Sequence, residues 1–167
     1  MRILFFILSG MFLGTAVPAQ DLVFDADHTA TCLTAGESRD AKLACVGVSA
    51  NACMEDTPGG FSTVGMGGCI SRELDWWDAR LNASYKTLMK REKADDLEFG
   101  AGQGGVPSKA AALRAMQRAW VPFRDASCAY EYSKWGGGTG GSPAAAGCLL
   151  DMTARQTLDL ESSAQNY

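Results

Sequence analysis

Apolar positions recur every three or four residues along several stretches of this chain, which is the spacing of one face of an α-helix. The clearest stripe consists of Ile70, Leu74, Trp77, Leu81 and Leu88. Acidic residues precede the stripe and lysines follow it, as the helix dipole favours. The pattern predicts a long amphipathic helix over residues 71–93, on which Glu73, Asp75 and Asp78 are interpreted as a solvated acidic face.

Two further helices are predicted towards the carboxyl terminus. The apolar stripe of the first consists of Leu113, Met116, Trp120, Phe123 and Tyr130. Because they lie on the stripes, Trp77, Leu81, Trp120 and Phe123 are predicted to be core residues. It predicts a helix over 108–133, with Pro122 inside it as a source of bending. The other helix is predicted over 144–162. Glycine-rich segments at 99–106 and 136–143 are predicted to be loops, so the two longest helices should lie antiparallel.

The amino-terminal part shows weaker patterns. Residues 20–31 have no clear period and are predicted to be coil, whereas 37–54 suggests a short helix that Gly47 weakens. The glycine- and proline-rich segment 56–68 is predicted to be a loop. Because no alternating strand pattern is present, we expect an all-α fold, a small helical bundle of three to four helices with Gly-rich loops.

The first nineteen residues have the layout of a secretory signal peptide. Arg2 is followed by an apolar run to Val17, and the small residues before Ala19 match a cleavage site. Glycine and serine interrupt the run, which is also short for a membrane span. We therefore expect export to the periplasm or the exterior, with no membrane anchor after cleavage.

Six cysteines follow the predicted signal peptide, and an even number in an exported chain predicts disulfides. Loop geometry favours pairing Cys128 with Cys148, Cys53 with Cys69, and Cys32 with Cys45. An alternative pairs Cys69 with Cys128, because antiparallel helices would bring the start of one near the end of the other. Such bridges would staple the bundle.

Charge and residue types exclude several function classes. The net charge of −4 argues against nucleic acid, whose phosphates need a basic surface, and permits attraction to a basic partner. His28 is the single histidine and no Cys-x2-Cys pair occurs, so neither a metal site nor another cofactor is expected. No nucleophile stands beside a recognisable base, so catalytic residues are not expected.

Polar residues follow the apolar stripes of the two long helices. Asp78 and Asn82 lie one turn apart on the first, and Gln117 and Arg124 lie two turns apart on the second. A buried Arg124 would need a carboxylate such as Asp78 or Asp125. These residues are interpreted either as a network that ties the helices together or as a binding site.

The spacing of these residues resembles that of the LprI-like lysozyme-inhibitor family. The matching positions are Cys69, Asp78, Leu81, Asn82, Tyr85, Gln117, Trp120, Phe123, Arg124, Asp125, Cys128, Gly140–Ser142, Cys148 and Arg155. The resemblance covers about residues 69–160. It divides the chain into a signal peptide (1–19), a cysteine-containing extension (20–68) and an LprI-like helical domain (69–167).

The resemblance implies a secreted binding protein, an inhibitor of lysozyme or another basic wall-active protein, rather than an enzyme. The candidate binding residues are Asp75, Asp78, Asn82, Gln117 and Arg124. The loops 136–143 and 56–68 are candidate inhibitory elements, since a constrained loop loses little freedom on binding. The alternative functions are a structural or envelope-interaction module, and a hydrolase whose site the sequence does not reveal.

Overall fold

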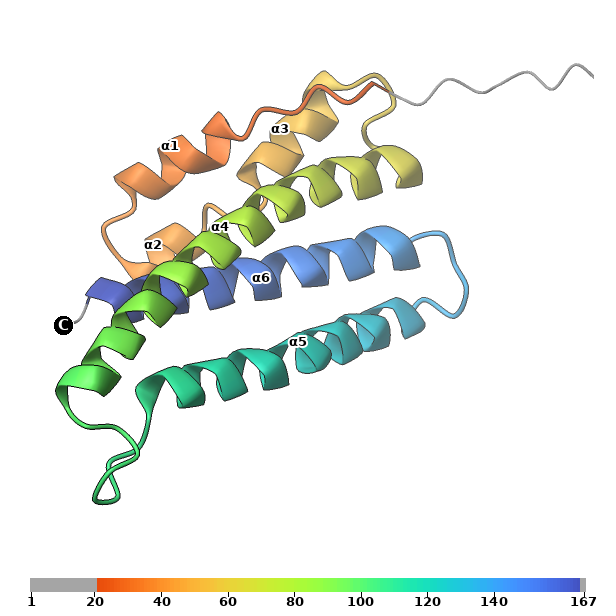
Figure 1. Ribbon diagram of the computed structural model, residues 1–167. Helices are drawn as coiled ribbons and strands as arrows, with labels where there is room; N and C mark the ends of the chain where they lie inside the picture. Colours follow the sequence, from red (N-terminus) through yellow and green to blue (C-terminus); the bar gives the residue numbers. More distant parts are fainter. Residues whose placement is uncertain (1–20, 166–167) are drawn as a thin grey trace, which may run out of the picture.

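The computed structural model describes residues 21–165, and the predicted signal peptide lies outside them. Within this described part, six helices follow one another: α1 (Asp27–Ala35), α2 (Arg39–Leu43), α3 (Val48–Asp56), α4 (Thr63–Glu98), α5 (Lys109–Ser133) and α6 (Gly141–Gln165) (Figure 1). The described residues contain no strand, which confirms the all-α class. There are more helices than the three to four predicted, because the amino-terminal extension folds into three short ones.

The three long helices form the main bundle. Figure 1 shows α4 and α5 running in opposite directions, as predicted, with α6 between them. Leu81 and Leu88 of α4, Leu113 of α5 and Leu160 of α6 form one apolar core. An ion pair between Arg80 and Glu161, 2.7 Å apart, also joins α4 to α6.

The short helices α1 to α3 form an amino-terminal layer that packs on α4 and α6, on the side away from α5 (Figure 1). The prediction of coil over 20–31 was wrong for α1, because tertiary contacts rather than an apolar stripe hold this helix: Leu33 packs with the fully buried Trp77. The predicted helix over 37–54 is broken at Gly47, whose φ of 91° is left-handed and suits glycine. His28, predicted in coil, lies exposed on α1.

The α4 helix begins earlier than predicted, because glycines that suggested a loop lie inside it. Ser62 caps the helix by accepting a hydrogen bond from the Gly65 amide at 3.0 Å. A Cβ at Gly65 would collide with the backbone of Gly60 at 2.6 Å, and one at Gly68 would meet Leu22 at 2.8 Å. These glycines permit close approach of the chain, so the loop predicted over 56–68 shrinks to 57–62.

Glu73 is the buried hydrogen-bonding centre of the layer, with 1% of its surface exposed, so its assignment to a solvated acidic face was wrong. Its carboxylate accepts hydrogen bonds from Thr29 Oγ1 and Trp77 Nε1. It also accepts from the backbone amides of Gly47 and Ala50, at 2.8 and 2.7 Å. Glu73 of α4 therefore caps α3, whose own N-cap residue has no side chain.

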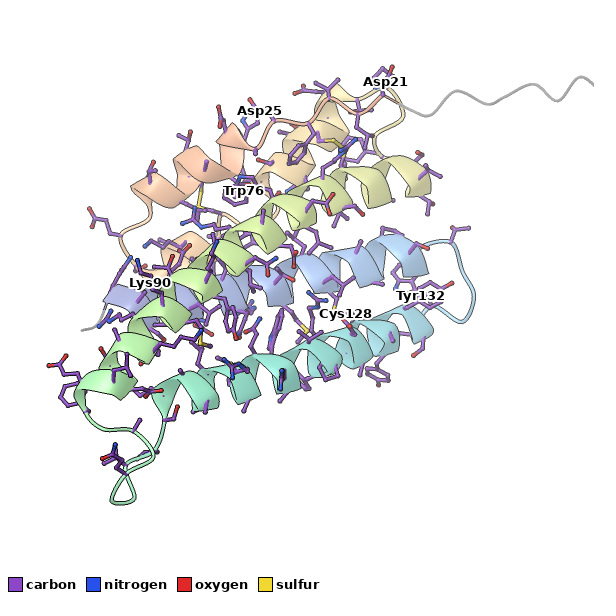
Figure 2. The ribbon with its side chains drawn as sticks, in the orientation of Figure 1. Asp21, Asp25, Trp76, Lys90, Cys128 and Tyr132 are labelled. Carbon is purple, nitrogen blue, oxygen red and sulfur yellow. A yellow bond between two sulfur atoms is a disulfide. The ribbon has the colours of Figure 1, made fainter. Side chains whose placement is uncertain are left out.

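Three disulfides staple the helices, and Cys128 points from α5 towards α6 in Figure 2. They join Cys32 to Cys45, Cys53 to Cys69, and Cys128 to Cys148. These are the pairs that loop geometry favoured, and the alternative pairing of Cys69 with Cys128 is not formed. The second bridge ties α3 to α4, and the third ties α5 to α6.

Asp96 fixes the start of α5. Its carboxylate accepts hydrogen bonds from Ser108 Oγ at 2.6 Å and from the Lys109 and Ala110 amides at 2.8 and 3.2 Å. The hydrogen bond from Ser108 lowers the pKa of Asp96 most, and the two amides and the charge of Lys109 lower it further. The contact therefore stabilises the ionised carboxylate in the folded state.

We expect this contact to stabilise the fold above about pH 4 and to be lost as the pH falls through the lowered pKa of Asp96, because the unfolded chain binds that proton first. Urea denaturation at pH 7 should show Asp96→Asn to be less stable than the parent. The difference between the two proteins should shrink at pH 3. A difference that is constant with pH would contradict the role of the charge.

Candidate functional site

An open groove of about 400 Å³ runs between α4 and α5. Asp78 and Asn82 line it from α4, and Gln117 and Arg124 line it from α5. Each pair lies on one face of its helix, and the antiparallel arrangement turns the two faces towards each other. Four of the five predicted binding residues therefore meet in one place. The fifth, Asp75, is exposed outside the groove.

Arg124 connects the groove to all three long helices. Its guanidinium donates to Asp125 Oδ1 at 2.8 and 3.0 Å and lies 4.0 Å from Asp78 Oδ1. Nη1 is also 3.5 Å from Thr153 Oγ1 of α6, and the guanidinium stacks 5.0 Å from the centre of the Trp120 ring. Both expected carboxylates thus contact Arg124, whose position they fix.

The other predicted residues divide between packing and exposure. Gln117 accepts a hydrogen bond from Gln156 Nε2 of α6 at 2.9 Å, so it ties α5 to α6. Asn82 Nδ2 donates to Asp78 Oδ2 at 3.0 Å, one turn away on α4. The polar atoms of Asp78 and Asn82 remain accessible from the groove, whereas Gln117 serves mainly to hold the bundle together.

Sequence reasoning missed two arginines on the rim of the groove. Arg114 and Arg118 lie one turn apart on α5, are exposed, and form no ion pair with any residue in the described part of the chain. With Arg124 they outnumber the single carboxylate of the lining, Asp78. In the sequence, the available signal was that Arg114, Arg118 and Val121 follow one another at steps of four and three residues. A solvated charged face of a helix has the same spacing, so this signal could not distinguish the two.

The expected core role holds for some stripe residues and not for others. Trp77 and Leu81 are buried, and Trp120 is half-buried beneath Arg124. The prediction that Phe123 belongs to the core was wrong, because 64% of its surface is exposed. Phe123 lies on the side of α5 that neither α4 nor α6 covers, so apolar spacing alone overestimated the width of the buried stripe.

The charge of the molecule is unevenly distributed. Residues 21–62 contain seven aspartates and glutamates and only two basic residues, Arg39 and Lys42. The helices of this acidic layer, α1 to α3, make no contact with α5 within the described structure. A protein of net charge −4 thus has one strongly acidic side and a separate groove with a local excess of arginine.

No helix within 21–165 combines the length and apolarity needed to cross a membrane. Among the same residues, no three His, Cys, Asp or Glu side chains are grouped to hold a metal ion.

The family model described as "Lysozyme inhibitor LprI" matches residues 53–160. The chain belongs to the LprI family. The resemblance seen in the sequence is thereby confirmed, and the match begins earlier than Cys69, so it includes both cysteines of the bridge between α3 and α4. All residues of the groove lie within the LprI match.

Two relatives of this LprI chain come from bacteria. An "uncharacterized 17.7 kDa protein in puhA 5'region" of Rhodobacter capsulatus is 27% identical over 156 residues, covering 93% of this chain and 94% of that protein. An uncharacterized protein of Rhizobium meliloti (strain 1021) is 29% identical over 93 residues, covering 56% of this chain and 67% of that protein. No solved structure gives a significant match.

Proposed function

We propose that this LprI-family chain is exported and acts without catalysis, as an inhibitor that binds a lysozyme-type wall-degrading enzyme in the periplasm or outside the cell. The family match over residues 53–160 is the observation that supports this most directly, because it encloses the whole groove. The three disulfides are consistent with an oxidising compartment, where such bridges persist.

Charge supports the choice of a cationic target. Lysozymes are small basic proteins, and the acidic layer of residues 21–62 would attract them at long range. The groove between α4 and α5 then offers hydrogen-bonding groups on a rigid, cross-linked support, which limits the freedom lost on binding. The acidic layer thus accounts for the encounter, and the groove for specific contact.

The test begins with the chain expressed in a bacterial host with residues 1–19 intact and recovered from the periplasmic fraction. Added to a cell-wall suspension with a small cationic lysozyme, it should slow lysis in proportion to dose, at micromolar concentrations or below. Raising the ionic strength should slow association, because salt screens the attraction. A reduced and alkylated sample is the control and should inhibit much less.

Unchanged lysis at a large molar excess of the oxidised protein would overturn the proposal. Recovery of the chain only from the cytoplasm would contradict the export part of it. Lysis of the suspension by the chain alone would instead indicate a hydrolase.

A further inference from the structure

The α5 helix is the least covered of the three long helices, and its solvent side is unusual. Side chains project from α5 away from α6 in Figure 2. The exposed residues along the middle of this side are small: Ala111, Ala112, Ala115, Ala119, Pro122, Ala126 and Ala129. A solvated helix face ordinarily carries charged residues. Alanines in their place let another surface approach the helix closely. What this side of α5 could bind therefore depends on the residues that border the alanines.

Arg114 and Arg118 border the alanines on the side of the groove. Both are exposed, and neither has an ion-pair partner among residues 21–165. Residues four apart on a helix have Cβ atoms about 5–6 Å apart, so the two guanidiniums can bind two separate carboxylates at once. Each guanidinium offers a planar fork of donors that suits bidentate pairing with a carboxylate.

Apolar side chains border the alanines on the other side. Met116, Phe123 and Tyr130 follow one another at intervals of seven residues, which places them in one row along the helix. Their exposed fractions are 43%, 64% and 64%. A row of exposed large apolar residues across the alanines from two arginines has the composition of a protein-binding surface, in which aromatic residues and arginine provide most of the binding energy.

We propose that this side of α5, with Arg114 and Arg118 on one border and Met116, Phe123 and Tyr130 on the other, covers the substrate cleft of the target enzyme. This inference rests on the proposed function. Glycoside hydrolases carry a pair of carboxylates in the cleft, roughly 5–10 Å apart. That separation matches what Arg114 and Arg118 span, so the two guanidiniums pair with these catalytic carboxylates.

The distribution of charge explains how an acidic inhibitor can bind carboxylates. The helices of the acidic layer, α1 to α3, make no contact with α5 in the described structure, so the acidic charge that attracts a basic enzyme lies away from the surface that would meet the carboxylates of its cleft. The row of Met116, Phe123 and Tyr130 then packs against the wall of the cleft and excludes water. Exclusion of water strengthens the pairing of the arginines with the carboxylates.

The first experiment measures the inhibition constant of Arg114→Gln/Arg118→Gln against the same lysozyme. We expect at least a ~10-fold loss of inhibition, equivalent to about 1.4 kcal/mol. The fold should remain intact, because both side chains are exposed and unpaired, and a thermal unfolding curve would check this. The matched control is Arg72→Gln/Lys86→Gln on α4, which also removes two positive charges from exposed side chains that form no ion pair among residues 21–165 and do not line the groove.

The second experiment identifies the atoms that the arginines bind. A lysozyme whose general-acid glutamate is replaced by glutamine should bind the parent chain at least ~10-fold more weakly in calorimetric titration. The same replacement should have little further effect on binding of the arginine double variant, because the pair is already broken.

The outcomes separate the two proposals. Equal inhibition by the parent and the arginine double variant would overturn the contact through α5 and leave the proposed function standing. If the glutamine replacement in the lysozyme weakens binding of the parent and of the arginine double variant equally, the direct pairing of arginines with carboxylates is also overturned. Failure of the parent chain to inhibit any lysozyme would overturn both proposals together.

Discussion

Glu73→Ala is expected to lower the free energy of unfolding by about 4 kcal/mol or more. The substitution removes the shared acceptor of four hydrogen bonds and leaves buried donors on Thr29, Ala50 and Trp77 and a half-buried donor on Gly47. A buried donor without an acceptor costs about 1–3 kcal/mol. Guanidinium denaturation of the parent and the variant measures the difference.

The conservative replacement tests whether the charge and the geometry both matter. Glu73→Gln keeps the volume but turns an amide NH2 towards at least one of the donors, so we expect a smaller loss of about 2 kcal/mol. The control is Glu55→Gln on the exposed side of α3, which should change stability by no more than about 0.5 kcal/mol. If Glu73→Ala unfolds within about 1 kcal/mol of the parent, the hydrogen-bonded centre does not hold the layer in place.

Loss of the bridge between α3 and α4 should have the next largest effect. Cys53→Ala/Cys69→Ala opens a loop closed over 16 residues, and the chain-entropy model gives a cost of about 3 kcal/mol. Both half-cystines are buried, so the vacated space adds to the loss. We expect α1 and α3 to lose amide hydrogen-exchange protection before α4 and α6, because the bridge attaches this layer to the bundle.

Reduction provides the control for that experiment. Dithiothreitol opens all three bridges of the parent and the two that the double variant keeps, so the difference in stability between the two proteins should shrink once both are reduced. If the difference between the proteins stays unchanged after reduction, the loss arises from packing rather than from the cross-link.

The long helices were predictable because a period of 3.6 residues is a local property of the sequence. The stripes that predicted helices over 71–93, 108–133 and 144–162 lie within α4, α5 and α6, apart from differences at the ends. The local disulfides were favoured for a related reason, since short loops bring cysteines together most readily. The family resemblance followed from residues fixed in spacing on these helices, and the match over 53–160 confirmed it.

Burial and partner choice depend instead on contacts between segments far apart in sequence. Glu73 sits in the first turn of the predicted helix, where an acid is expected on the surface, and only the arrival of α1 and α3 buries it. Phe123 fits the apolar stripe of α5, yet α6 and α4 leave it uncovered. Periodicity states which residues share a face, but not how much of that face a neighbour covers.

The same distinction applies to the candidate site. The sequence identified Asp78, Asn82, Gln117 and Arg124 as polar residues at regular helical spacing, and their positions within one groove required α4 and α5 to pack antiparallel. Arg114 and Arg118 carried no such mark, because an unpaired arginine on a rim and a solvated arginine have the same local sequence. Local spacing therefore determined the three long helices and favoured their staples, whereas tertiary packing alone decided which charges are buried, which are paired and which remain available to a partner.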